Sequence, residues 1–148
     1  MSEHSIDLSW SRGSGPFERG NYGREHDIRF EGGQTVRNSA ASAYGGDTAA
    51  SNPEELLVAA LSSCHMLTFL AVAANRGYVV DSYVDHAIGV LEKDADGRMA
   101  VTRAVLSPKV RFGGDKQPSA EDYAAMQQRA HAGCFIANSV KTAVELRL

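Results

Sequence analysis

The stretch that most constrains the fold is the apolar run NPEELLVAALSSCHMLTFLAVAAN, from Asn52 to Asn75. Asn52 has a side chain suited to an N-cap, and Pro53 suits the first helical position. Glu54 adds negative charge at the positive end of the helix dipole. The run therefore predicts one long α-helix that stops before Gly77, a typical C-terminal signal.

Apolar residues cover nearly every face of this helix, so we expect protein to surround it. Its length also suits a membrane span. Polar side chains near its middle favour a buried helix instead; they are Ser62, Ser63, His65 and Thr68. One small sheet covers only one side of such a helix, so we expect a homodimer that shares helices.

The remaining segments predict an α+β fold in one domain, residues 1–148. Three short strands are expected before the long helix, over 5–10, 24–33 and the start of 34–51. Two segments after it alternate at period two and predict a long antiparallel hairpin, 78–93 and 99–112 joined by 94–97.

The C-terminal part predicts a second helix and a last strand. Ser119, with an acidic residue three positions on, is a capping signal for a helix that runs to about Ala132. A short helical segment is expected over 136–141, and a closing strand over 142–148.

Charge and cysteine content narrow the classes of function. The net charge is −3 and no block of Lys or Arg occurs, so nothing predicts binding to nucleic acid or to an anionic membrane. The polar N-terminus has no signal-peptide core. Two cysteines without an export signal argue against a structural disulfide framework, so we expect a reducing, cytoplasmic location.

Cys64 and Cys134 are the only cysteines and leave several chemistries open. Free cysteine is often simply buried, where it behaves as a small hydrophobe. His131 and Cys134 have the i, i+3 spacing of a chelating pair, so with Cys64 they define an alternative zinc-binding site. A non-catalytic stress or binding protein with two inert thiols is a further alternative.

Two sequence blocks favour a redox pair. NPEELLVAALSSC and AHAGCFIANSVK, separated by a long hairpin and followed by a closing strand, resemble the bacterial OsmC/Ohr family of osmotically inducible and organic-hydroperoxide-resistance proteins. The resemblance covers essentially the whole chain. It implies antiparallel sheets wrapped around long central helices in an intertwined homodimer.

The same resemblance implies a thiol peroxidase in oxidative-stress defence. Cys64 would attack the O–O bond of an organic hydroperoxide and become a sulfenic acid, and Cys134 would condense with it to a disulfide. The resemblance implies no bound cofactor. A lipoylated protein or another external dithiol would reduce the disulfide.

Family members also place an arginine and a glutamate near the reactive sulfur. Glu54 matches the glutamate and Arg24 the arginine, with Arg19 and Arg29 as alternatives. On an unbroken helix Glu54 and Cys64 lie about 15 Å apart along the axis, so they do not touch. Activation of the thiol therefore has to come from outside its own helix.

Three further residues bear on the substrate. Met66 and Phe135 adjoin the two cysteine regions and are expected to line an apolar substrate pocket. His65 stands where related reductases tend to have an apolar residue. It points about 100° away from Cys64 on the helix, so we expect a hydrogen-bonded, half-buried histidine rather than the direct base.

Overall fold

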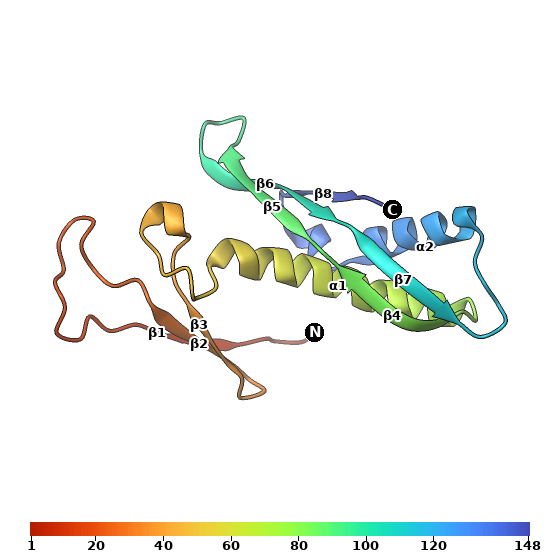
Figure 1. The fold of residues 1–148 in the computed structure, drawn as a ribbon, viewed down its shortest axis with the longest axis horizontal. Helices are drawn as coiled ribbons and strands as arrows, with labels where there is room; N and C mark the ends of the chain where they lie inside the picture. Colours follow the sequence, from red (N-terminus) through yellow and green to blue (C-terminus); the bar gives the residue numbers. More distant parts are fainter. The chain divides into compact units, whose positions relative to one another are not determined.

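In the computed structural model, which describes residues 1–148, the chain forms two compact units that are described separately. Unit 1 spans Met1–Leu56 and unit 2 spans Leu57–Leu148. Strands precede and follow a long helix, and the predicted α+β class is confirmed (Figure 1). The expectation of a single domain stays a prediction.

Unit 1 is built on a three-stranded antiparallel sheet in the order β1-β2-β3. The strands are β1 (Ile6–Ser9), β2 (His26–Phe30) and β3 (Thr35–Asn38), followed by the 3-10 turn η1 (Ser42–Tyr44). β2 is shorter than expected from the sequence, and Arg24 lies before it rather than within it. The carbonyls just before the strand accept hydrogen bonds from side chains instead of from a neighbouring strand.

Helix α1 (Pro53–Asn75) begins at the end of unit 1 and continues through unit 2. Asn52 Oδ1 accepts the Glu55 N–H at 2.9 Å, and Glu55 Oε2 accepts the Asn52 N–H at 3.1 Å. This reciprocal pair is a capping box and confirms the predicted start. At the other end Gly77 has φ +74°, the left-handed conformation that stops a helix.

The predicted hairpin is present, but each of its arms is split into two strands. The first arm contains β4 (Val79–Asp85) and β5 (Ile88–Lys93), and the second contains β6 (Met99–Leu106) and β7 (Pro108–Gly113). β4 pairs with β7 and β5 with β6, both antiparallel. Asp85 Oδ1 accepts the Ser107 N–H at 2.7 Å where both arms break.

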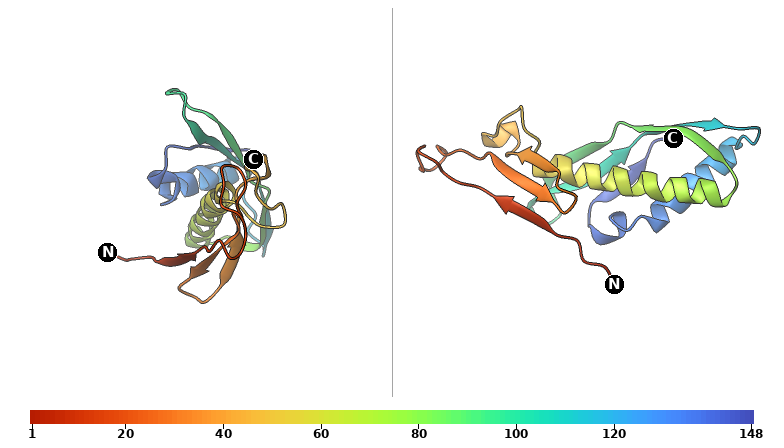
Figure 2. Two further views of the ribbon diagram at one scale, coloured as in Figure 1. Left: turned by 90° about the vertical axis from the view of Figure 1, so that its left-hand side faces the viewer. Right: turned by 90° about the horizontal axis from the view of Figure 1, so that it is seen from below.

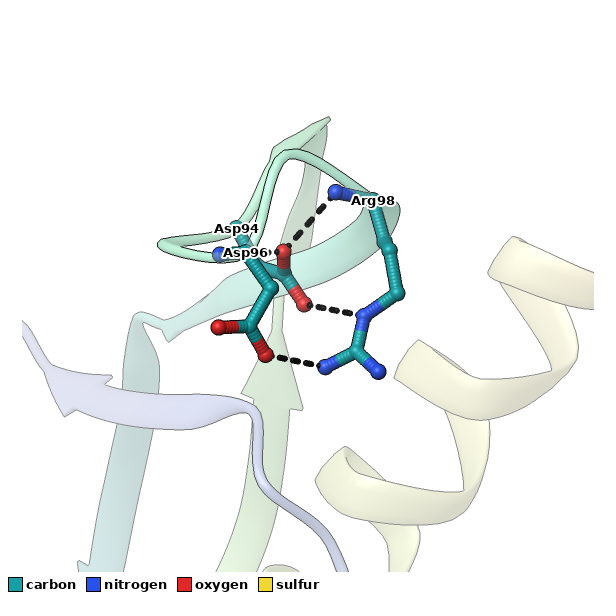
Figure 3. A network of polar contacts seen from close by, with 3 residues as sticks. All are labelled: Asp94, Asp96 and Arg98. Atoms are coloured by element: carbon teal, nitrogen blue, oxygen red, sulfur yellow. Dashed lines mark hydrogen bonds and ion pairs between the residues drawn. The ribbon is translucent and has the colours of Figure 1, made fainter.

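Three charged residues close the tip of this hairpin (Figure 3). Asp94 Oδ1 accepts the backbone N–H groups of Asp96 and Arg98, both at 2.9 Å. The Arg98 guanidinium forms ion pairs with both carboxylates. The backbone hydrogen bonds to Asp94 shape the turn, and exposed ion pairs of this kind add at most about 1 kcal/mol.

The core of unit 2 lies between α1, α2 (Ala120–Gly133) and the β4–β7 ribbon. Figures 1 and 2 show α2 beside the second half of α1. Apolar side chains fill the space between them. The buried residues at the centre are Phe69, Ala73, Tyr78, Met126 and Ala130. This packing fixes the end of α2 against the middle of α1.

The chain ends with η2 (Ala137–Ser139) and β8 (Ala143–Leu146). The short helical segment and the closing strand were both predicted from the sequence. β8 pairs with β6 in parallel, so this sheet is not purely antiparallel.

Candidate active site

Cys64 lies in the middle of α1, next to the row that faces the core. That row repeats every four residues: Leu61, His65, Phe69 and Ala73 are all buried. Cys64 is offset from the row and half-buried, and its neighbours Ser63 and Leu67 are exposed. The sulfur is therefore in contact with the protein interior and open to a reactant from outside.

Cys134 caps the C-terminal end of α2. Its backbone is extended (φ −74°, ψ 111°), so the chain leaves the helix axis directly after Gly133. The side chain is buried, with 1% of its surface exposed. Its Sγ accepts the backbone N–H of Ala137 at 3.4 Å.

The fold brings the two cysteines into contact. The Cys134 thiol hydrogen-bonds to the Cys64 sulfur. Both cysteines are free rather than joined in a disulfide. Neighbouring sulfurs can form a disulfide once one of them is oxidised.

The environment of Cys64 favours the thiolate. Burial raises its pKa, but hydrogen bonds outweigh this effect and the pKa lies below its ordinary value. The donors are the backbone N–H of Ile136, the thiol of Cys134, the backbone N–H of Phe135 and the hydroxyl of Thr68. A thiolate, not a thiol, is the attacking form of cysteine.

Cys134 has the opposite shift. Burial raises its pKa, the Ala137 N–H lowers it, and the hydrogen bond to and charge of Cys64 raise it further. The two sulfurs thus differ in chemical role, because Cys64 ionises first and Cys134 keeps its proton. A nucleophile beside a protonated second thiol is the arrangement required for attack followed by disulfide formation.

Thr68 and Gly133 hold the two sulfur-bearing segments together. The Thr68 hydroxyl donates to the Cys64 carbonyl oxygen at 2.8 Å, and its position near the Cys64 sulfur contributes to the lowered pKa of that thiol. A Cβ at Gly133 would lie 3.2 Å from Thr68 Cγ2, which is tighter than ordinary van der Waals contact. Glycine therefore lets the end of α2 come close to α1.

A cavity of about 560 Å³ opens beside Cys64. Its walls are mostly apolar and come from α1 and from the turn after α2: Ala60, Ser63, Cys64, Leu67, Thr68, Ala71, Gly133, Phe135 and Ile136. Phe135 lies in this wall with 80% of its surface exposed, and its predicted contact with a substrate stays a prediction. Met66 is not part of this wall.

Arg24 and Glu54 lie in unit 1 and do not form an ion pair with each other there. The Arg24 guanidinium donates to the carbonyl oxygens of Tyr22 at 2.9 Å and Gly45 at 3.4 Å. Glu54 Oε2 is buried without a hydrogen-bond partner. Their predicted roles beside the sulfur stay predictions, and the alternatives Arg19 and Arg29 are exposed.

His65 is fully buried rather than half-buried, with 1% of its surface exposed. Its Nε2 lies 2.7 Å from Gln127 Oε1, while Gln127 Nε2 donates to the Tyr123 hydroxyl at 3.0 Å. That hydroxyl donates in turn to the Pro108 carbonyl at 3.1 Å. A carbonyl oxygen only accepts hydrogen bonds, so each group in this series donates towards Pro108. Gln127 Oε1 therefore accepts from His65, and the His65 proton lies on Nε2. His65 links α1 to α2 and does not act on the sulfur.

The alternative zinc site is not formed. No group of three or more His, Cys, Asp or Glu side chains is placed to hold a metal ion. His131 Nδ1 is buried without a hydrogen-bond partner, and it does not complete a ligand set with Cys64 and Cys134.

Sequence reasoning missed two contributors to the site. Thr68 is four residues after Cys64 and so lies on the same helix face, a spacing that identifies it in retrospect. The backbone N–H groups of Phe135 and Ile136 carry no side-chain signal. They reach Cys64 only because the chain turns back after α2.

The structure thus combines an α+β fold with a half-buried cysteine, a buried second cysteine and an apolar cavity. The sequence model of the family described as OsmC-like protein matches residues 45–148. The chain therefore belongs to the OsmC-like family. Among proteins with curated descriptions, none matches this sequence.

Solved structures extend the likeness to the whole chain. An OsmC-like protein of unknown function from Vibrio cholerae is 43% identical, with TM-score 0.96 and 99% of each chain covered. An organic hydroperoxide resistance protein from Elizabethkingia anophelis is 15% identical, with TM-score 0.73 and coverage of 100% of this chain and 94% of that one. The organic hydroperoxide resistance protein OhrB of Bacillus subtilis is 19% identical, with TM-score 0.63 and coverage of 99% and 98%. The latter two share the fold.

Proposed function

We propose that the protein is a thiol peroxidase that reduces organic hydroperoxides to alcohols in oxidative-stress defence. The observation that supports this most directly is the lowered pKa of Cys64, in contact with the thiol of Cys134 beside an apolar cavity. Membership of the OsmC-like family, and the names of two structures with the same fold, agree with it.

In the first step the Cys64 thiolate attacks the terminal oxygen of the hydroperoxide. The S–O bond forms as the O–O bond breaks, and the departing alkoxide takes up a proton to leave as an alcohol. Cys64 is oxidised to a sulfenic acid while the peroxide is reduced. The cavity wall around Phe135 would hold the organic part of the substrate.

In the second step the Cys134 sulfur attacks the Cys64 sulfenic acid. A disulfide forms and water leaves with the Cys134 proton. An external dithiol, such as a lipoylated protein, then restores both thiols by exchange and becomes a disulfide itself. No bound cofactor is needed in this sequence of steps.

Arg24 and Glu54 belong to the proposal as supporting groups. Arg24 would stabilise the thiolate and polarise the peroxide, and Glu54 would orient Arg24. The Arg24 guanidinium has no acidic partner and the Glu54 carboxylate has a buried oxygen without a hydrogen bond. Both groups therefore have unused capacity for such an interaction.

The proposal includes a cytoplasmic homodimer. In the single chain a row of α1 residues at four-residue spacing is exposed: Ala59, Ser63, Leu67 and Ala71. A second copy packed on this row would cover the apolar face that the chain leaves open and would form a further wall of the cavity, which shares Ser63, Leu67 and Ala71 with this row. A reaction that returns two cysteines to the thiol form after each turnover suits a reducing compartment.

The test is peroxide consumption by the full-length protein. Cumene hydroperoxide and hydrogen peroxide are compared, first with dihydrolipoamide and then with thioredoxin as reductant. We expect rapid loss of both free thiols and turnover of the organic peroxide. Cys64→Ser should abolish turnover, whereas Cys134→Ser should permit one attack and then overoxidation of Cys64. Retention of both thiols in the presence of peroxide would contradict the proposal.

A further inference from the structure

Unit 1 contains a second cavity, which has no cysteine in its wall. Its volume is about 650 Å³, within the range of about 300–1,000 Å³ typical of small-molecule sites. Four aromatic side chains line it: Trp10, Phe17, Tyr22 and Tyr44. Each is between 39% and 64% exposed, so these rings form an open apolar surface rather than a closed core.

Arg24 is the one residue of the wall that carries a permanent charge. Its guanidinium lies over the Tyr22 ring, 4.3 Å from the centroid. The hydrogen bonds to Tyr22 and Gly45 both come from Nη1, so Nη2 and Nε have no acceptor. A guanidinium has five N–H donors, and a free edge of this kind matches a carboxylate with two parallel hydrogen bonds.

The wall around Arg24 is held in place before any ligand arrives. Three consecutive carbonyls accept hydrogen bonds from side chains of the cavity: Tyr22 O from Arg24, Gly23 O from Trp10 Nε1 at 3.0 Å, and Arg24 O from His26 Nδ1 at 2.8 Å. Asn38, which is buried, donates to His26 Nε2 at 3.1 Å. The tautomer of His26 is thereby fixed.

Gly45 completes this support. Its φ is +74°, and a Cβ there would lie 3.3 Å from Arg24 Cζ. Only glycine combines this backbone conformation with so close an approach to the guanidinium. The fold thus holds the Arg24 side chain across the aromatic surface rather than in solvent.

We propose that unit 1 binds a small aromatic carboxylate, with the rings of Trp10, Phe17, Tyr22 and Tyr44 around its apolar part and the free edge of Arg24 on its carboxylate. Aromatic rings pack favourably edge-to-face or offset, which suits a flat ligand. The proposal goes beyond the peroxidase function, because binding of this ligand consumes no peroxide. It shares Arg24 with that function, so a carboxylate bound to the free edge of Arg24 would compete with the supporting role proposed for it above.

Trp10 is the only tryptophan of the chain, so its fluorescence reports on this cavity and on the smaller polar pocket that Trp10 shares with Arg37. Full-length Cys64→Ser protein, which lacks the reactive thiol, is titrated with 4-phenylbutyrate and with the neutral 4-phenylbutyramide. We expect a saturable fluorescence change with the carboxylate. Binding of the amide should be weaker by about tenfold or more, the size of a charge-assisted hydrogen bond.

Substitutions in the cavity wall test which residue binds which part of the ligand. Arg24→Gln should reduce carboxylate binding to the level of the amide, while Arg24→Lys should retain part of the preference. Phe17→Ala should weaken both ligands. Arg29→Gln removes an exposed arginine outside the cavity and should change neither.

The proposal would be overturned if the Cys64→Ser protein, with no second substitution, bound 4-phenylbutyrate and 4-phenylbutyramide equally well. This comparison does not require an Arg24 variant that folds. The absence of saturation would also overturn the proposal. The other contrary outcome is a fluorescence that changes with protein concentration and not with ligand concentration. If sedimentation shows self-association over the same range, the cavity belongs to a second copy of the chain, and the proposal is overturned.

Discussion

At the scale of single residues, the reactivity of Cys64 depends on a small set of hydrogen bonds. Burial alone would keep the sulfur protonated, because a charge in an apolar environment is unfavourable. The donors from Thr68, Cys134 and the turn at Phe135 and Ile136 reverse that preference. Thr68 is the donor that mutation removes most cleanly.

Thr68→Val, a change of similar shape without the hydroxyl, should raise the pKa of Cys64. One neutral hydrogen bond is worth about 0.5–1.5 kcal/mol, so alkylation of Cys64 near neutral pH should slow by roughly two- to tenfold. The measurement is the rate of iodoacetamide modification against pH in Cys134→Ser protein. Thr68→Ser keeps the hydroxyl and should follow the parent, and identical pH profiles for Thr68→Val and the parent would remove Thr68 from the site.

His65 should make the stability of the protein depend on pH. Burial lowers its pKa below the ordinary value of 6.5; Gln127 raises it, His131 lowers it and Asp85 raises it. The unfolded chain thus binds this proton more readily than the folded one. The contribution of neutral His65 is fully present above about pH 6.5 and is lost as the pH falls towards the folded pKa.

The measurement is urea unfolding from pH 7.5 to 5. The parent should lose more unfolding free energy over this range than His65→Gln, which has no titrating ring at that position. His65→Gln should be the less stable of the two at pH 7.5, since it loses the buried packing of the imidazole. Parallel pH curves would show that His65 does not titrate in this way.

Much of the site at this scale was predictable from the sequence, and the rest depends on tertiary structure. The pairing of Cys64 with Cys134 followed from family resemblance. The donors at Phe135 and Ile136 were not predictable, because any residue has a backbone N–H and only the turn after α2 aims these two at the sulfur. The full burial of His65 depends likewise on Gln127, which is distant in the sequence.

At the scale of elements, the approach of α2 to α1 controls how readily the two sulfurs meet. Gly133→Ala would place a methyl group 3.2 Å from Thr68 Cγ2. The end of α2 has to move by a few tenths of an ångström, so we expect disulfide formation to slow severalfold. The rate is followed by free-thiol loss after one equivalent of cumene hydroperoxide.

A second substitution separates this contact from a general loss of stability. Thr68→Ser removes Cγ2 and keeps the hydroxyl, so Thr68→Ser combined with Gly133→Ala should restore most of the rate. A double variant as slow as Gly133→Ala alone would show that the contact does not set the distance between the sulfurs.

Element types were predicted better than their limits. Period-two alternation identified both arms of the long hairpin, yet not the break in each. The break is made by Asp85 and Ser107, whose hydrogen bond joins positions that no local pattern connects. The sequence predicted that Arg24 lies inside a strand. In the structure β2 begins only at His26, because the carbonyl oxygens just before it accept hydrogen bonds from side chains.

At the scale of the whole molecule, the exposed row of α1 that includes Leu67 predicts that the protein is a dimer in solution. In the single chain, 61% of the Leu67 surface is exposed on a helix that is apolar throughout. Sedimentation should give twice the chain mass of 15.9 kDa. Leu67→Glu should shift the protein towards the monomer, because a buried unpaired carboxylate is costly.

The matched control is Lys93→Glu, a charge change at an exposed strand end outside this row. It should leave the mass unchanged. A monomeric parent would contradict the proposed homodimer.

The sequence predicted that α1 needs cover from other protein, because α1 is apolar on nearly every face. The division into two compact units was not predictable from the composition.

The N–H of Ala137 donates to the Cys134 sulfur, and those of Phe135 and Ile136 donate to Cys64. When the two sulfurs join, the negative charge on Cys64 that the Phe135 and Ile136 donors stabilise disappears. We therefore expect segment 135–137 to loosen on oxidation. In the proposed cycle, an external reductant would then meet a different local backbone in the disulfide form than in the dithiol form.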